Sequence, residues 1–404
     1  MNITDQLTRC LSQGQHATLE MLGQASESIG VKIFLVGGSV RDIMLNRPFT
    51  DLDVSVECKP ESIIKTLPSH RVKVKSTSLF GTAKLLVDHY IVDMAMSRAE
   101  SYPVPGQLPE VFRSDIRDDL RRRDFTVNSM AVSLNPKTWG ELLDLYGGID
   151  DINARLIRII EVDSFVKDPT RIFRAARYSC RLNFKLDVKA RRLVEENHEA
   201  IKGLSGTRIA NEFRSIFNEP NPYIVLNVLE KWKVLADVSS GLTLGNRLCE
   251  IMGSEWCPSH DRAVLGFVLL SIPLSESDRT VFFRRLNLDK KLIIAIQSVA
   301  EIEALRECTC RGQIYEVLSN QSKLAMEAVS SYDEGQLEKH IELFQSELSE
   351  LNVEVSGDDL LLMGIQEGPE MGKIIKAVRN AVVAGNISTR EEQIEFAKKL
   401  VVND

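Results

Sequence analysis

The stretch LVGGSVRD, residues 35–42, followed nine residues later by DLD, residues 51–53, decides the fold of the first part of this chain. A short β-rich run, VKIFLV (31–36), leads into two glycines, and the pattern after them is helical. Gly37 and Gly38 allow the backbone to approach a ligand closely, and the start of a helix favours a bound phosphate. The stretch therefore predicts a strand, a tight turn and a helix that together bind an anion.

One arginine and two carboxylates accompany this turn. Arg41 lies in the first turn of the expected helix, where it can reach the same anion. Asp51 and Asp53 are two residues apart on an expected strand, so both side chains project from one face. Two carboxylates beside a phosphate-binding turn suit a divalent metal that holds a nucleoside triphosphate. Either half alone could be an ordinary turn or strand start, whereas their combination favours a nucleotide site.

The neighbouring sequence predicts a mixed sheet. Apolar residues at helical spacing indicate one helix over residues 5–29. Four further β-rich runs follow the first strand: DLDVSV (51–56), RVKVKST (71–77), GTAKLLV (81–87) and HYIVDMAM (89–96). We therefore expect an α/β head of about 145 residues with a mixed sheet.

After about residue 150 the strand signals stop and helical patterns continue to the C-terminus. The fold class is therefore α+β, with an all-helical remainder. The chain has 404 residues, enough for two to three domains of ordinary size. We expect a head over 1–148, a helical neck over 149–220, and a helical body and tail over 221–404.

Composition and charge exclude two broad classes. With 44% hydrophobic and 26% charged residues the chain can build a core, so wholesale disorder is excluded. The formal net charge of −7 excludes a globally basic nucleic-acid binder, but not a local basic patch. Residues 167–192 contain nine Lys or Arg and two Asp, a local charge of +7 in an acidic protein.

The basic segment has a helical pattern of its own. Arg171, Arg174 and Arg177 recur every three residues and so lie along one flank of a helix. Asp168 lies one turn before the first of them. The arginines alternate with apolar residues, so the helix must be partly buried, and a buried arginine needs an anion or a planar polar partner.

These motifs together resemble the nucleotidyltransferase superfamily, and more closely the bacterial class II tRNA nucleotidyltransferases and the related poly(A) polymerases. The resemblance covers about residues 33–215, with its motifs in the family's order. Beyond the first motif it is carried by Asp93 in IVDMA, a loop-like stretch at 97–120, RRRDFTVNSMA (121–131), DLYGG (144–148), DPTRIFRAARY (168–178) and GTRIANE (206–212).

The resemblance implies a role for each motif. It makes Asp51 and Asp53 ligands of two Mg²⁺ ions, with Asp93 as a third catalytic carboxylate. In-line attack of an RNA 3′-hydroxyl on the α-phosphorus of a nucleotide then releases pyrophosphate. The implied nucleotide-binding residues are Gly38, Arg41, Arg123, Asp124, Asn128, Asp168, Arg171, Arg174 and Arg177.

The resemblance also implies the substrates. Asp168 and Arg171 would hydrogen-bond the edge of the incoming base, which selects CTP and ATP without a nucleic-acid template because cytosine and adenine both carry an amino donor next to an acceptor. The RNA would be tRNA, bound by the helical part. The family usually has an acidic residue before this Asp, where this chain has Lys167. Restoring that acid is expected to keep or sharpen base selection.

Several alternatives remain open at this stage. A poly(A) polymerase usually carries a basic segment soon after the catalytic carboxylates, and the matching stretch here, KSTSLFGTAKLLV, lacks it. A non-catalytic RNA-binding protein would have no need for intact Asp51 and Asp53. Full CCA addition and A-only addition are not separated, while the presence of the loop at 97–114 disfavours CC-only addition.

The remaining signals concern location. The seven cysteines have no CxxC pair, which is typical of reduced thiols in a cytoplasmic protein. No signal peptide is visible. The longest apolar run, residues 263–274, is too short to span a bilayer and predicts a buried helix. None of the six histidines falls in a motif. The sequence says nothing about protein partners or oligomeric state.

Overall fold

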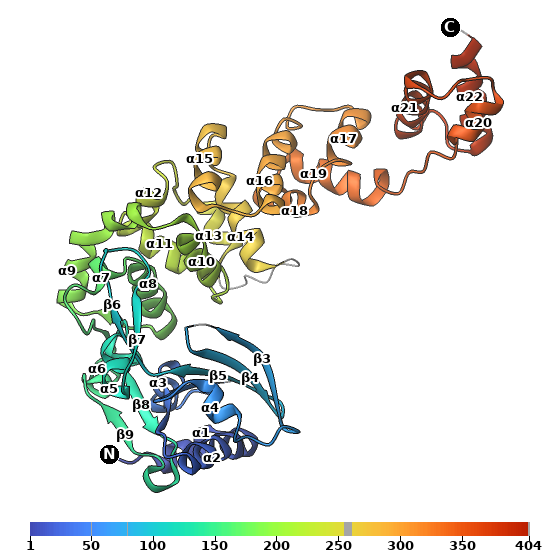
Figure 1. The fold of residues 1–404 in the computed structure, drawn as a ribbon. Coiled ribbons are helices and arrows are strands. Elements are labelled where there is room, and N and C mark those ends of the chain that lie inside the picture. Colours follow the sequence, from blue (N-terminus) through green and yellow to red (C-terminus); the bar gives the residue numbers. More distant parts are fainter. Residues whose placement is uncertain (50, 79, 254–260, 403–404) are drawn as a thin grey trace. The chain divides into compact units, whose positions relative to one another are not determined.

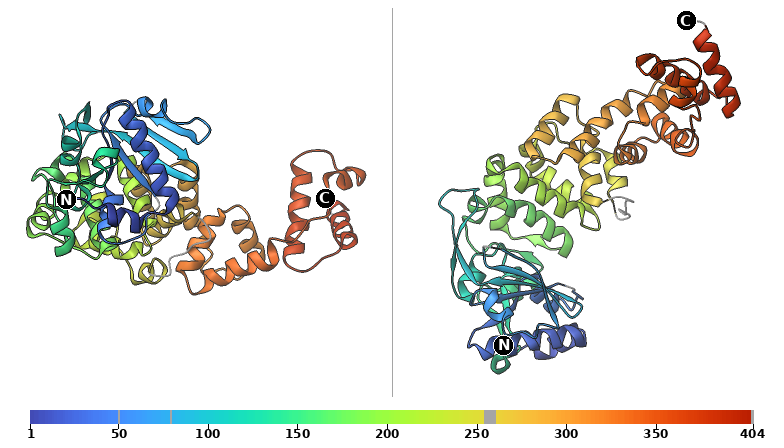
Figure 2. Two further views of the ribbon diagram at one scale, coloured as in Figure 1. Left: turned by 90° about the horizontal axis from the view of Figure 1, so that it is seen from below. Right: turned by 45° about the vertical axis from the view of Figure 1, so that its right-hand side comes forward.

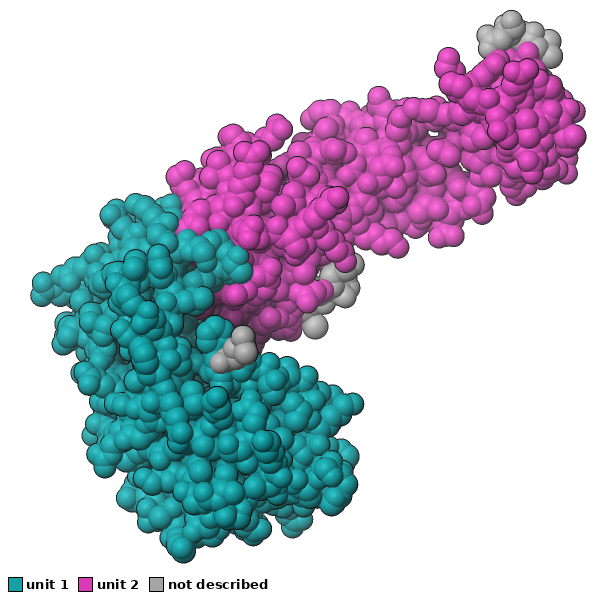
Figure 3. All heavy atoms as spheres, viewed as in Figure 1, with its two compact units in different colours: residues 1–208, 228–237 teal, residues 209–227, 238–404 magenta. Residues whose placement is uncertain are grey.

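The structure is a computed structural model that describes residues 1–49, 51–78, 80–253 and 261–402 (Figure 1). Two compact units divide the chain: Met1–Arg208 with Val228–Asp237, and Ile209–Asn227 with Val238–Asp404 (Figure 3). The three-part division into head, neck and body is finer than these two units and stays a prediction. One of the seven cysteines, Cys257, and one of the six histidines, His260, lie outside the described residues.

A seven-stranded mixed sheet forms the centre of the first unit, in the order β3-β4-β5-β2-β1-β8-β9. Only β2 and β5 pair in parallel, and the other neighbours are antiparallel. The five expected strands are confirmed, while β8 and β9 carried no recognised signal. The strands are β1 (Ile33–Val36), β2 (Leu52–Val56), β3 (Val72–Ser78), β4 (Thr82–Val87), β5 (Tyr90–Met96), β8 (Met130–Ser133) and β9 (Leu142–Asp144).

The two faces of this sheet differ in polarity because side chains alternate along each strand. One face is apolar: Val54, Leu85, Val92 and Met94 are buried there, and α2 (Gln13–Ser28) and α4 (Pro60–Ile64) contact the sheet and each other. The opposite face carries the charged residues of β2, β4 and β5. We call it the polar face of the sheet.

The N-terminal segment forms two helices, α1 (Thr4–Cys10) and α2, so the prediction of one helix over 5–29 was wrong. The first helix ends at Cys10, and Ser12 caps the start of the second, where its side chain and that of Gln15 form a capping box. The helical spacing of apolar residues runs through both helices, and only the cap marks the break.

The stretch expected to be a loop between 97 and 120 contains a β-hairpin. Strands β6 (Arg98–Ser101) and β7 (Glu110–Arg113) pair with each other and form their own two-stranded sheet. Helix α5 (Ile116–Arg121) follows and packs against the start of the hairpin. A 3₁₀ turn, Thr126–Asn128, then leads into β8.

The rest of the first unit is mainly helical, from α6 (Gly148–Ala154) onwards. The expectation of no strands after residue 150 was wrong, because β10 (Leu156–Ile157) and β11 (Lys185–Leu186) form a short parallel pair. Two residues are too few to show an alternating pattern. The following helices are α7 (Ser164–Lys167), α8 (Thr170–Leu182), α9 (Val188–Asn197) and α10 (Gly206–Phe217), which runs on into the second unit.

The described part of the second unit contains helices and no strands (Figure 2). Its core near α10 includes the rings of Phe213, Phe217 and Phe267, which contact one another in tilted and edge-to-face arrangements. The apolar run at 263–274 is the buried helix α14, as expected, and no described helix is long and apolar enough to cross a membrane. The helices are α11 (Pro222–Lys231), α12 (Val234–Val238), α13 (Asn246–Ile251), α14 (Arg262–Ser271), α15 (Glu276–Leu286), α16 (Lys290–Glu303), α17 (Arg311–Leu318), α18 (Lys323–Tyr332), α19 (Gln336–Leu343), α20 (Gly357–Leu362), α21 (Pro369–Val383) and α22 (Arg390–Val402), with α11 and α12 shared between the units.

Candidate functional site

Three carboxylates gather where β2 and β5 lie side by side. Asp51 is exposed just before β2, and Asp53 lies within the strand and is partly buried. Asp93 is the direct parallel neighbour of Asp53. The Ser39 hydroxyl donates to the carbonyl of Asp51 over 2.8 Å, which ties the start of the strand to the glycine turn. Two carboxylates 40 residues apart in the sequence are thus adjacent on the polar face.

The environment of Asp53 makes its ionised form costly. Burial raises the pKa of Asp53, and the negative charges of Asp93 and Asp51 raise it further, to about 6. Arg123 and Lys84 lower the pKa and offset part of this effect. A carboxylate held in this way gains from any cation that reaches it.

We expect Asp53→Asn to stabilise the metal-free protein while removing a functional group. Because the folded-state pKa is raised from 3.8 to about 6, the carboxylate costs stability above that pH, and the cost disappears as the pH falls towards 4. Melting in EDTA should show the variant higher than the parent protein by roughly 2–4 °C at pH 8. The two should converge near pH 4. A variant that melts lower at pH 8 would contradict this account.

The glycine turn has the backbone conformation that its sequence requires. Gly37 has a φ of 71°, in the left-handed region that favours glycine. A Cβ at this position would lie 2.7 Å from Nη1 of Arg123, so a larger residue would displace that guanidinium. Gly38 then begins α3 (Gly38–Met44). The turn and Arg123 are therefore packed together, 86 residues apart in the sequence.

A polar network connects four of the expected nucleotide-binding residues. Arg41 donates through Nη1 to Oδ1 of Asn128 over 2.7 Å, and the Asn128 amide donates to Oδ1 of Asp124 over 3.2 Å. Oδ2 of Asp124 accepts from Nε of Arg174 over 2.7 Å. Burial raises the pKa of Asp124, but Arg174 and Asn128 outweigh it and hold the pKa below its usual range. The motifs around residues 41, 124 and 174 thus form one rigid unit.

Arg41 has an additional partner within this network. Nε and Nη2 of Arg41 both donate to Asp42 over 3.0 Å, and the side chain is almost fully buried. In the structure Arg41 is therefore bound to Asp42 and Asn128. Its expected contact with a phosphate stays a prediction.

Four arginines surround the ring of Tyr178 on α8. Their guanidinium carbons lie 5.4–5.9 Å from the ring centre, close enough for cation–π interactions. The Tyr178 hydroxyl also accepts from Arg174 over 3.3 Å. One aromatic ring thus holds several positive charges together on a partly buried helix. The four are Arg41, Arg174, Arg177 and Arg181.

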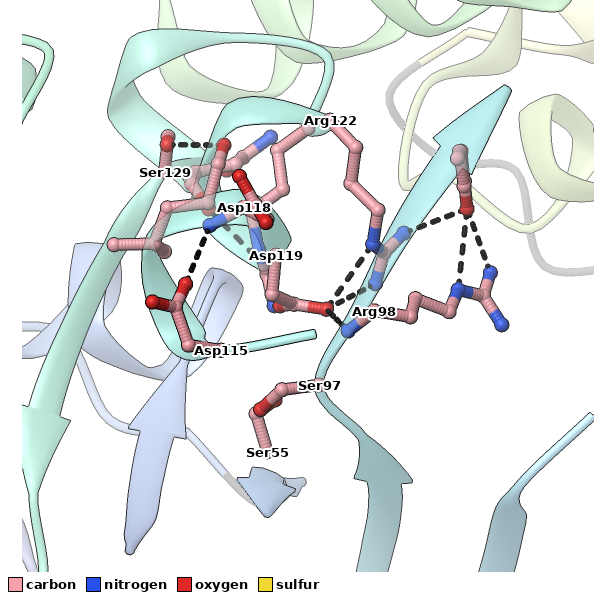
Figure 4. Close-up of polar contacts among 12 residues, drawn as sticks. Ser55, Ser97, Arg98, Asp115, Asp118, Asp119, Arg122 and Ser129 are labelled. Carbon is pink, nitrogen blue, oxygen red and sulfur yellow. Dashed lines mark hydrogen bonds and ion pairs between the residues drawn. The ribbon is translucent and has the colours of Figure 1, made fainter. Parts of the chain in front are cut away.

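A second polar cluster connects α5 with the hairpin (Figure 4). Asp119 is buried and accepts from Arg122 and Arg123 over 2.7–3.0 Å. Burial raises the pKa of Asp119, yet these two arginines lower it overall. On the hairpin, Glu100 accepts from Arg98 and from Arg122. Arg122 therefore joins the hairpin to α5, next to the arginine that packs on the glycine turn.

Asp168 and Arg171, the expected base-reading pair, have separate partners. Asp168 lies just before α8 rather than on it, and its Oδ1 accepts from the Thr170 backbone and hydroxyl and from Nη2 of Arg208, the last over 2.6 Å. Arg171 donates to Oγ of Ser164 over 2.6 Å and to the carbonyl of Arg122 over 2.7 Å. Each side chain is thus fixed before any ligand binds.

Arg208 also connects Asp168 to the hairpin tip. Its Nη1 donates to the carbonyl of Gly106 over 2.6 Å, and the Gly106 amide donates to the carbonyl of Lys167. The sequence had placed Arg208 in a motif without giving it a role.

Lys167 binds two acidic residues of its own. Its Nζ lies 2.6 Å from Oε2 of Glu161 and 3.0 Å from Oδ2 of Asp163. A glutamate at position 167 would therefore face two carboxylates. Arg171 is anchored by Ser164 and Arg122, and the effect of Lys167→Glu on base selection stays a prediction.

The residues fit a metal that is shared with a nucleotide. Among the described residues, no group of three His, Cys, Asp or Glu could hold a metal ion by itself. Mg²⁺ is usually bound through one or two carboxylates together with substrate phosphates and water. Asp51 and Asp53 meet that requirement, and a bound cation would offset the burial and the negative charge of Asp93 that raise the pKa of Asp53.

Several contributing residues were missed by the sequence analysis. Asp119 precedes Arg122 and Arg123 by three and four residues, the helical spacing of an ion pair, and that signal could have been recognised. Tyr178 is the aromatic residue next to the arginine stripe. Ser164 and Lys84 gave no sequence signal, because their contacts with Arg171 and Asp93 form only when the chain folds.

Two segments of the chain match known families. Residues 33–158 match the family described as "Poly A polymerase head domain", and residues 259–397 match "tRNA nucleotidyltransferase domain 2 putative". The first match contains both the glycine turn and the carboxylates.

Three curated relatives align with most of the chain. An "A-adding tRNA nucleotidyltransferase" of Geobacter sulfurreducens is 31% identical over 98% of this chain and 48% of the relative, so the chain spans about half the length of that protein. An "A-adding tRNA nucleotidyltransferase" of Halalkalibacterium halodurans is 28% identical over 98% of this chain and 95% of the relative. A "CCA-adding enzyme" of Enterococcus faecalis is 28% identical over 92% of both chains.

Solved structures show the same fold. An apo "CCA-adding enzyme" matches with a TM-score of 0.80 at 23% identity, over 100% of this chain and 99% of the other. A Thermotoga maritima "CCA-adding enzyme complexed with tRNA_CCA" matches with a TM-score of 0.73 at 24% identity, over 100% and 99%. At these identities the likeness concerns the fold.

Proposed function

Because two segments of this chain match tRNA nucleotidyltransferase and poly(A) polymerase families, we propose that it is an enzyme of this kind that adds AMP from ATP to the 3′ end of tRNA. The observation that carries the proposal is the adjacency of Asp53 and Asp93 on the polar face, beside a glycine turn on which Arg123 packs. This arrangement supplies carboxylates for a metal and cations for a triphosphate in one place. AMP addition is the first candidate because relatives aligned over 98% of the chain are A-adding enzymes.

The chain's own residues can be given roles in this reaction. Mg²⁺, bound by Asp51 and Asp53 with the nucleotide, would lower the pKa of the RNA 3′-hydroxyl and stabilise charge on the triphosphate. The backbone at Gly38 leaves room for the phosphates. Arg123, Arg174 and Arg177 balance the charge that develops as pyrophosphate leaves. Asp124 and Asn128 keep Arg41 and Arg174 in place.

The contacts of Asp168 support its role in base selection. All of its hydrogen bonds from described residues reach Oδ1, and the side chain is 18% exposed. Oδ2 is then available to accept from an exocyclic amino group, while Arg171 supplies a neighbouring donor. Adenine and cytosine offer that amino group, whereas the Watson–Crick edge of uracil does not.

Full CCA addition is the second candidate, because the chain is also 28% identical to a CCA-adding relative over 92% of both chains. The test uses one tRNA transcript ending at the discriminator base, in C, or in CC, with CTP and ATP supplied separately. An A-adding enzyme extends only the CC form, and only with ATP. Incorporation of CMP would establish the second candidate, and no incorporation at all would overturn the proposed function.

Binding of tRNA is expected to depend steeply on salt. Basic residues continue along α8 and α9 with exposed side chains at Arg191 and Arg192, and contacts to RNA phosphates release counterions. A plot of log affinity against log salt should be linear with a negative slope set by the number of phosphates contacted. Filter binding at 50–300 mM salt measures this. A flat response, or equal affinity for an unstructured RNA of the same length, would favour a poly(A) polymerase.

The division of labour within the chain follows from the same proposal. A catalytic head over 1–148 and a base-reading neck over 149–220 carry the chemistry, and the body and tail over 221–404 bind tRNA. None of the six described cysteines forms a disulfide, which supports the proposal of a reducing, cytoplasmic location.

A further inference from the structure

Lys84 lies in the row of charges on the polar face. On β4 it is the direct antiparallel neighbour of Asp93, which in turn is the direct neighbour of Asp53. Three adjacent strands therefore place Lys84, Asp93 and Asp53 side by side. Nζ of Lys84 lies 3.3 Å from Oδ2 of Asp93.

This ion pair is poorly explained as a stabilising contact. The side chains of Lys84 and Asp93 are 49% and 43% exposed, and exposed pairs of this kind contribute little to folding stability. Its position gives it a different consequence. The ion pair places a positive charge beside Asp93, the direct neighbour of Asp53 on the next strand. The charge of Lys84 also lowers the pKa of Asp53.

A metal ion bound to Asp93 would be repelled by the ammonium of Lys84, which already pairs with Oδ2 of the same carboxylate. Neighbouring strands lie about 4.8 Å apart, so the carboxylates of Asp53 and Asp93 are close enough to share a cation. With Lys84 beside it, the third carboxylate of the site is a weaker metal ligand.

We propose that Lys84 is a positioning residue that holds Asp93 in place of a metal ion. This inference rests on the proposed function. Metal binding is then left to Asp51 and Asp53 with the phosphates of the nucleotide. The metal-free site binds a divalent ion weakly, and the metal arrives together with its nucleotide.

The test measures Mn²⁺ binding to the full chain by electron paramagnetic resonance, without RNA or nucleotide. We expect Lys84→Met to tighten the Mn²⁺ dissociation constant by about tenfold or more, because Asp93 becomes a third ligand. Lys84→Arg should bind as the parent protein does, because it keeps the charge. Lys73→Met is the matched control: Lys73 is an exposed lysine on the neighbouring strand β3, and its removal should change the constant less than twofold.

Repeating Lys84→Met in an Asp93→Asn background separates ligation from charge alone. Without Asp93, we expect the substitution to tighten binding by no more than about threefold. Equal effects in both backgrounds, or no effect in the first, would overturn the inference.

Mn²⁺ binding to Asp53→Asn distinguishes a failure of the proposed metal site from a failure of the role proposed for Lys84. It should weaken Mn²⁺ binding at least about tenfold. If it does not, the metal site of the proposed function is wrong. If it does while Lys84→Met changes nothing, only the role of Lys84 is wrong.

Discussion

Asp53→Ala should reduce nucleotide incorporation at least about 1,000-fold while leaving tRNA affinity within about twofold. Losing a metal-holding carboxylate removes several kcal/mol of stabilisation from the transition state, and each 1.36 kcal/mol corresponds to a factor of ten in rate. The tRNA is proposed to bind the helical part of the chain, so its affinity should not depend on this carboxylate. Single-turnover incorporation and filter binding on the same preparation measure the two quantities.

Asp51→Ala should behave in the same way, and Lys73→Met serves as a surface control that keeps full activity. Asp51 is the more exposed of the two carboxylates, so its removal perturbs the fold less. If either aspartate variant keeps more than a few per cent of the parent rate in Mg²⁺, the assigned metal site is wrong. Loss of tRNA binding in parallel would instead indicate a damaged fold.

Asp168→Ala should change the choice of nucleotide more than it changes metal binding. Removing one of a pair of base contacts typically costs about 1–3 kcal/mol of discrimination, so use of UTP or GTP relative to ATP should rise roughly 5- to 100-fold. The total rate should also fall, because Arg208 loses its carboxylate partner. The measurement is kcat/KM for all four nucleotides on one tRNA.

Two further variants distinguish residues that contact the base from residues that only hold Asp168 in place. Arg171→Ala removes the other proposed base contact and should also relax selection. Thr170→Val removes the hydroxyl that donates to Oδ1 of Asp168 over 2.6 Å and leaves the carboxylate present, so it should have a smaller effect. If Asp168→Ala slows every nucleotide by the same factor, this segment does not read the base, and its arginines serve only the phosphates or the RNA.

The sequence by itself determined the local chemistry of this protein. The glycine turn, the paired aspartates and the five first strands could be recognised because a period of two and a pair of glycines are local properties of the chain. The arginine stripe of α8 was equally visible, since its spacing of three residues places it on one helical flank. Lys167 was recognised as unusual, but its ion pairs with Glu161 and Asp163 were not visible, because they form only on folding.

Only the tertiary structure decided which of these groups meet. Whether Arg41 faces a phosphate or an asparagine 87 residues away depends on how β8 packs beside β1, and no local pattern contains that information. The hairpin at 98–113 went unrecognised because its exposed strands lack an apolar face. The pairing of Lys84 with Asp93 follows from the register of β4 on β5, and a shift of one residue would have turned Lys84 to the apolar face. Register is set by the burial of a whole sheet face, which is a property of the assembled core and not of any single strand.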